Sequence, residues 1–166
     1  MADTAASIET ALAEFFELIH KGGWQGRENE AVNLFAHSCL NRFLDIERVG
    51  IEVAVKNPFS DGKLVTRKDL VVWPKPRMTC WNSNGGFNTP DAVVEWKYFG
   101  PPKRSNASIT EEKPMHAWLQ AFSNQNPRAL GYAVVLDNSS ETPIMRVTRY
   151  LAGEAFRQVL GTTLGR

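Results

Sequence analysis

Apolar residues recur at spacings of three and four in two segments near the start of the chain, which is the pattern of amphipathic helices. The first segment runs from Ser7 to Lys21, with Ser7 as its expected N-cap, and GGWQG at positions 22–26 ends it. The second helix is expected from Arg27 to Phe43. At about 100° per residue, Glu28 falls on the apolar stripe of this second helix and Glu30 nearly opposite. Glu28 should therefore face inward, although an acid in a first turn can also simply complement the helix dipole.

Short apolar runs bounded by turn residues follow, as expected for β-strands. A helix over residues 108–124 interrupts them, with a capping box at Ser108 and Glu111, unless Pro114 marks the start of its regular part. A closing helix is expected from Ala152 to Leu160. This order predicts an α/β protein with a mixed central β-sheet of about five strands flanked by α-helices. The expected strands are Gly50–Lys56, Arg67–Trp73, Pro90–Phe99, Leu130–Asp137 and Ile144–Tyr150.

The third expected strand, PDAVVEWKYF, carries charged residues within an apolar run. Side chains alternate between the two faces of a strand, so Asp91, Glu95 and Lys97 share one face, and Trp96 lies on the other. A carboxylate and an ammonium group at a buried strand are costly to desolvate unless they are paired or used. The strand is therefore a candidate functional site.

Length and composition place the chain among ordinary globular proteins. Its 166 residues fit one domain, and 43% of them are hydrophobic and 22% charged. No apolar run approaches the roughly 18 residues of a membrane span, and no secretory signal is recognisable. Cys39 and Cys80 lack the spacing of a zinc site or a disulfide framework, so a cytoplasmic protein is expected.

The net charge of +1 is low for a nucleic-acid-binding module, but the charge is unevenly distributed. Residues 48–104 hold 10 basic and 5 acidic groups, whereas residues 1–47 hold 3 basic and 8 acidic groups. The basic part includes a long loop at positions 74–89 that is rich in Pro, Gly and Asn, and loops of this length in compact domains are often binding or assembly elements, or else disordered. The candidates for nucleic-acid contact are Arg67, Lys68, Lys75, Arg77, Trp81, Lys103 and Arg104.

Asp69 and Glu95 could together hold a divalent cation if their strands pair, because Mg²⁺ takes one or two carboxylates and keeps water or phosphate oxygens elsewhere. Lys97 could then position the attacking water or offset charge on the phosphate, and Glu28 could bind the same water or a second metal. The pattern acid, any residue, Lys occurs three times in the chain, but only Glu95-Trp96-Lys97 lies on a hydrophobic strand. The alternative is a structural ion pair between Lys97 and one or both acids.

These residues resemble the motif of the PD-(D/E)XK nuclease superfamily, which has the restriction-endonuclease-like fold. The resemblance is carried by Glu28, by Asp69 in KDLVVW, and by Glu95 and Lys97 in VVEWKY. It implies that Asp69, Glu95 and the Trp96 backbone carbonyl are metal ligands, that Lys97 is the catalytic lysine, and that Glu28 is the helix carboxylate. Asp91 forms a literal PD with Pro90 but lies on the same strand as Glu95, so it is the second choice for the aspartate.

The resemblance covers residues 27–150 as a core, preceded by a helical extension at residues 1–26. It implies a Mg²⁺-dependent nuclease, with Mn²⁺ able to substitute, that hydrolyses phosphodiester bonds of DNA. A different interpretation is a non-catalytic binding or assembly subunit of a nucleic-acid-processing, phage or defence complex that keeps the same fold. A homodimer formed through the long loop is compatible with either function.

Overall fold

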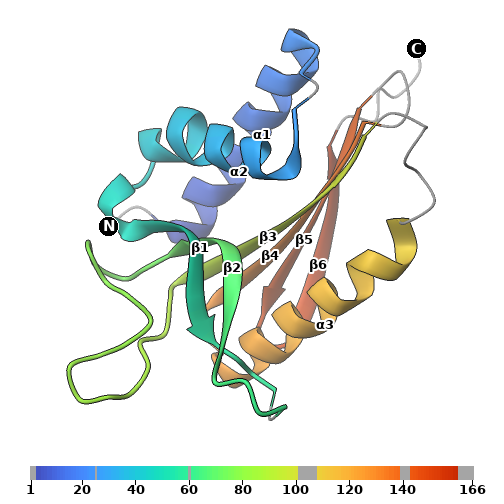
Figure 1. The fold of residues 1–166 in the computed structure, drawn as a ribbon. Coiled ribbons are helices and arrows are strands. Elements are labelled where there is room, and N and C mark those ends of the chain that lie inside the picture. The colour runs from blue at the N-terminus through green and yellow to red at the C-terminus, as the bar shows by residue number, and fades with distance from the viewer. Residues whose placement is uncertain (1–2, 25, 60, 101–107, 139–142, 161–166) are drawn as a thin grey trace.

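The computed structural model describes residues 3–24, 26–59, 61–100, 108–138 and 143–160. Within these residues a six-stranded mixed sheet has helices on both faces, with α1 and α2 on one side and α3 on the other (Figure 1). The helices are α1 Thr4–Gly22, α2 Glu28–Leu34 and α3 Ser108–Gln125. The strands are β1 Val49–Lys56, β2 Val65–Val72, β3 Ala92–Phe99, β4 Leu130–Asp137, β5 Ile144–Leu151 and β6 Glu154–Leu160.

The strands lie in the sheet in their order along the chain. Among the six strands described, β3 and β4 are the one parallel pair, and α3 provides the long connection that a parallel pair requires. The other neighbours are antiparallel. The prediction of an α/β protein with a mixed sheet between helices is therefore confirmed, and the five expected strands are present.

The sixth strand corrects the expected closing helix at Ala152–Leu160. Ala152 and Gly153 both have positive φ, 51° and 83°, and they form a two-residue turn that folds β6 back onto β5. Turns with positive φ at both central residues match the twist of a β-hairpin. The apolar residues after the turn have a helix-like spacing, but this turn starts a hairpin.

The two N-terminal helices differ in detail from the expectation. Helix α1 starts at Thr4, and its N-cap is Asp3, whose side chain accepts a hydrogen bond from the Ala5 amide at 3.0 Å, so Ser7 is a buried helical residue. The second segment is α-helical only as far as Leu34. It continues as a π-helical turn and a 3₁₀ turn over residues 35–42. The predicted apolar stripe of this segment still faces the core: Val32, Phe35, Ala36 and Cys39 are buried, and Phe43 is partly buried.

Two hydrophobic clusters, one on each face of the sheet, form the core. Helices α1 and α2 cover the first cluster, so the helix expected as an N-terminal extension is packed into the same core as the sheet. Helix α3 covers the second cluster. This helix already begins at Ser108, with Pro114 inside it, so the proline does not mark its start; the side chains of the expected capping box, Ser108 and Glu111, lie outside the described part.

The long loop between β2 and β3 has internal structure. Trp81 and Phe87 form an antiparallel bridge, and the Asn82 side chain accepts hydrogen bonds from the amides of Asn84 and Gly86. Cys80 in this loop and Cys39 are both buried, and neither forms a disulfide. Among the described residues, no helix combines the length and the apolar character that crossing a membrane would need.

Candidate functional site

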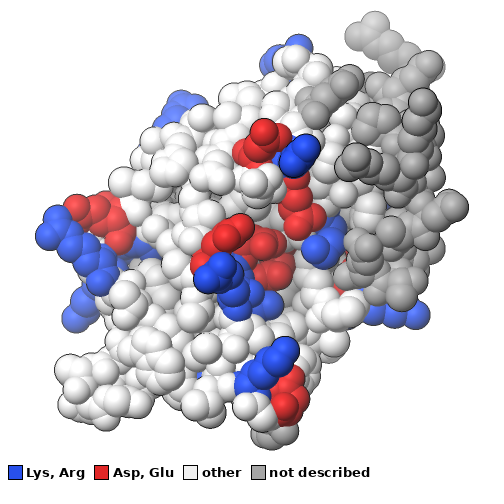
Figure 2. All heavy atoms as spheres, viewed as in Figure 1, with Lys and Arg blue, Asp and Glu red and all other residues white. Residues whose placement is uncertain are grey.

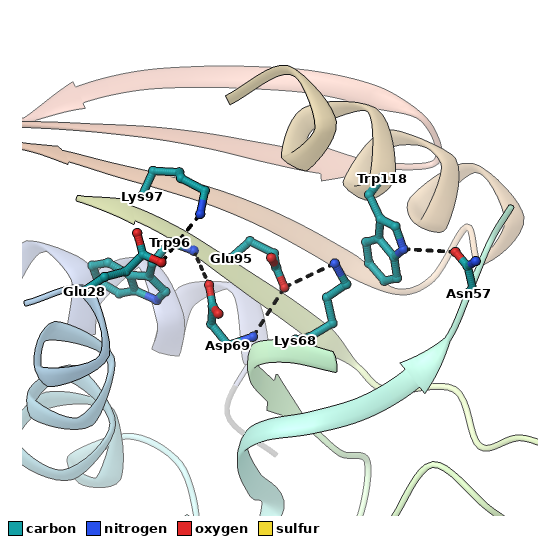
Figure 3. A network of polar contacts seen from close by, with 8 residues as sticks. All are labelled: Glu28, Asn57, Lys68, Asp69, Glu95, Trp96, Lys97 and Trp118. Carbon is teal, nitrogen blue, oxygen red and sulfur yellow. Dashed lines mark hydrogen bonds and ion pairs between the residues drawn. The ribbon is translucent and has the colours of Figure 1, made fainter. Parts of the chain in front are cut away.

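The predicted acids meet where β2 and β3 separate. Towards the C-terminal end of β3, the last residue pair in the ladder between these strands is Leu70 with Val94. Beyond that pair, side chains replace backbone contacts: the Asp69 amide donates to Glu95 Oε1 at 3.3 Å, and the Trp96 amide donates to Asp69 Oδ2 at 2.8 Å (Figure 3). The two carboxylates predicted as a pair are therefore neighbours.

Glu28 reaches the same strand from the first turn of α2. Its Oε2 accepts a hydrogen bond from the Tyr98 amide at 3.0 Å, and its Oε1 lies 3.5 Å from Lys97 Nζ. The amides of Trp96 and Tyr98, which β2 no longer pairs, are thus bound by carboxylates. The N–H and C=O of a strand residue point to the same neighbour, so the Trp96 carbonyl faces the gap that Asp69 occupies. The structure brings together the residues of the expected site.

Lys68 is a further member of this cluster. It was expected as a contact for nucleic acid, but its side chain is only 9% exposed and its ammonium group lies 3.4 Å from Glu95 Oε1. The same group lies 3.8 Å from the centre of the Trp118 ring, and Trp118 Nε1 donates to Asn57 Oδ1 at 3.3 Å (Figure 3). Lys68 therefore belongs to the internal network of charges and not to an exposed cationic surface.

Strand alternation predicts Lys68 on the same face as Leu70 and Val72, which pack in the cluster under α1 and α2. Its side chain instead points to α3. Asp69 and Glu52 lie opposite each other between β2 and β1, but they are not paired in the ladder of these strands. Glu52 has a φ of +50°. This local distortion turns the strand pair, and Val53, the partner of Lys68, also packs on the α3 side. The sequence signal available for this role was a lysine flanking the candidate aspartate.

Burial dominates the electrostatics of the cluster. It raises the pKa of Glu95 to about 7, and the nearby Lys68 opposes this only in part. Burial also raises the pKa of Asp69 and of Glu28 above the ordinary values. It lowers the pKa of Lys68, against the attraction of Glu95. The two lysines therefore offset only part of the cost of removing these carboxylates from water.

The described residues contain no group of three or more His, Cys, Asp or Glu side chains close enough to hold a metal ion. What the cluster offers is a pair of carboxylates, Asp69 and Glu95, with the Trp96 carbonyl facing the same gap. Two carboxylates are within the usual protein ligand set of Mg²⁺. Because this pair is desolvated and carries raised pKa values, its chemistry fits a cation.

Asp91, the second choice for the aspartate, is placed elsewhere. It lies just before β3, and its carboxylate forms an ion pair of 2.8 Å with Arg48. Arg48 also donates to the Trp73 carbonyl at 2.8 Å. Asp91 thus ties the starts of β1 and β3 together at the other end of the strand from Lys97.

The remaining candidates for nucleic-acid contact are dispersed. Arg67 and Arg77 are exposed but lie near acids, 3.8 Å from Glu52 and 2.7 Å from Glu47. Lys75 is exposed, and Trp81 is half-exposed with its ring centre 4.7 Å from that of Phe87. On the face of the molecule drawn in Figure 2, acidic and basic side chains lie side by side, without a continuous basic surface. Lys103 and Arg104 lie outside the described residues.

Comparisons of the chain with protein-family models, with curated proteins and with solved structures gave no match.

Proposed function

We propose that this protein is a metal-dependent nuclease that hydrolyses phosphodiester bonds of DNA. The observation that carries the proposal is the pair of desolvated carboxylates, Asp69 and Glu95, at the point where β2 and β3 separate. A lysine and a third carboxylate, Lys97 and Glu28, lie beside this pair. A structural ion pair needs one acid, whereas here β2, β3 and α2 each place a carboxylate at the same strand edge.

Asp69, Glu95 and the Trp96 carbonyl would hold Mg²⁺, and Mn²⁺ would substitute for it. The bound ion would polarise the scissile phosphate and lower the pKa of a water molecule. Lys97, which is 29% exposed, would orient this water or offset negative charge on the phosphate. Glu28 would hold the Lys97 ammonium group in place, and it also fixes the strand edge through the Tyr98 amide.

The order of elements supports the finer proposal of a restriction-endonuclease-like fold. Helix α2 is followed by three antiparallel strands, then by α3 and by β4, which is parallel to β3. The elements after Lys97 match the helix and strand that the resemblance implies. Strands β5 and β6 extend the sheet beyond this core.

Calorimetric titration with Mn²⁺ and cleavage of labelled DNA and RNA test the proposal together. Asp69→Asn and Glu95→Gln should each weaken Mn²⁺ binding by tenfold or more and abolish cleavage, because they remove a charged ligand. Lys97→Ala should abolish cleavage while Mn²⁺ still binds. Glu30→Gln is the matched control, since it makes the same change at an exposed residue of α2 and retains the side-chain oxygen that accepts from the Arg27 amide.

A second candidate function is a non-catalytic binding or assembly subunit with the same fold. The contact between Lys68 and Glu95 favours it, because a cation of the chain itself already lies against one of the two acids. Under this alternative, wild-type protein and Glu95→Gln bind Mn²⁺ equally weakly and neither cleaves DNA or RNA. That result would exclude the nuclease.

A further inference from the structure

A cavity of about 570 Å³ lies on the flank of α3 next to β5 and β6, and the proposed nuclease site does not account for it. Successive side chains of β5 point to opposite faces of the sheet, and Thr148 and Tyr150 face α3 together with Arg146. Arg157 of β6 is the cross-strand neighbour of Thr148 on β5 and lines the same cavity. From α3, His116 adds an imidazole ring to the polar lining.

Cations predominate in this cavity. Arg146 is bound by Glu112 at 2.8 Å and lies 4.0 Å from Asp137. Lys113 and Arg157 also line the cavity, and neither makes an ion pair with a residue that the structure describes. Among the described residues that line the cavity, Glu112 is the one acid, so this part of the lining carries an excess of positive charge.

The lining also presents polar atoms that hold one another in place. His116 Nδ1 and the Tyr150 hydroxyl lie 2.6 Å apart, and His116 Nε2 lies 3.8 Å from Glu112. Burial lowers the pKa of His116, which favours the neutral ring, and a neutral imidazole can either donate to or accept from the tyrosine. Guanidinium groups beside hydroxyl groups match the oxygens of a phosphate, which are charged and accept several hydrogen bonds.

We propose that this cavity between α3, β5 and β6 binds a phosphate group, with Arg157 and Arg146 as its main ligands and Thr148 and Tyr150 as hydrogen-bond partners. The phosphate belongs either to a small phosphorylated molecule or to a nucleic-acid backbone. The site does not depend on Asp69 or Glu95, so its test is independent of that of the nuclease.

Titration followed by NMR chemical shifts tests the proposal, in EDTA and at an ionic strength kept constant with chloride. The probes are inorganic phosphate, a 5′-mononucleotide and a single-stranded DNA of about twelve nucleotides, which is within the usual length of single-strand sites. Saturable shifts are expected at His116 and at the Gln120 side-chain amide, which lines the cavity. Comparable affinities for all three probes indicate a small ligand, and much tighter binding of the DNA indicates a backbone; both support the site.

Arg157→Gln is the decisive variant, because this exposed residue has no ion pair to lose in the described part of the chain and its removal should leave the fold intact. It should weaken binding of the best probe by about tenfold, as expected for the loss of one charged hydrogen-bonding partner. Arg128→Gln removes the same charge from the exposed turn after α3 and should leave binding unchanged. The proposal is overturned if no probe gives saturable shifts in the cavity, or if the two variants weaken binding equally.

Discussion

Replacing Glu95 by Gln tests whether the cost of burying this carboxylate is real. The side chain is only 14% exposed, and burial raises its pKa to about 7 from its ordinary value of 4.5. Gln has nearly the same shape and keeps an oxygen that can accept from the Asp69 amide. The substitution therefore removes the ionisation and leaves most of the contacts.

The direction of the effect follows from proton linkage. Between about pH 4.5 and about pH 7, Glu95 of the folded, metal-free protein binds a proton that the unfolded chain has released, so the folded state is favoured at low pH and stability falls as the pH rises. At about 1.4 kcal/mol for each pKa unit, the free energy of unfolding should fall by about 3 kcal/mol across this window. In Glu95→Gln this part of the fall should be absent.

Urea unfolding followed by tryptophan fluorescence in EDTA measures this difference at several pH values from about 5 to about 8. The variant and the wild type should have similar stability near pH 5, and the variant should be the more stable protein near pH 8. Glu30→Gln, at an exposed position, should follow the wild-type curve. If wild type and Glu95→Gln lose stability in parallel over this range, the raised pKa of Glu95 is wrong.

Three further substitutions test contacts that hold the fold together, each by the same urea unfolding near pH 7. Asp91→Asn should cost about 1–2 kcal/mol, because Arg48, 15% exposed, would lose its charged partner; a change within error would show that the pair is only a surface contact. Gly153→Ala should cost about 1–2 kcal/mol, since φ is +83° and the added Cβ would lie 3.2 Å from Asn124 Oδ1; an unchanged midpoint would contradict the hairpin turn. Phe15→Ala should cost about 3–5 kcal/mol because the ring is fully buried, whereas a cost below about 1 kcal/mol would show that α1 is peripheral.

Most of the fold could be predicted because the apolar period matches the local structure over long segments. The five expected strands were identifiable in this way, and so was the inward direction of Glu28. The closing segment was not, since two residues with positive φ, Ala152 and Gly153, outweigh a helix-like spacing. The candidate site was predictable as a set of acids on neighbouring elements. The buried position of Lys68 was not, because it depends on a distortion at Glu52 that no periodicity records.

The carboxylates along β3 also have a consequence for association between chains. A strand that loses its neighbour exposes amides that can pair with a strand of another molecule and start aggregation. In this protein Asp69 and Glu28 occupy the amides of Trp96 and Tyr98, and their negative charge covers the backbone that β2 leaves bare. The same acids therefore protect an otherwise open sheet edge, so a variant that lacks both would expose a template for β-sheet growth.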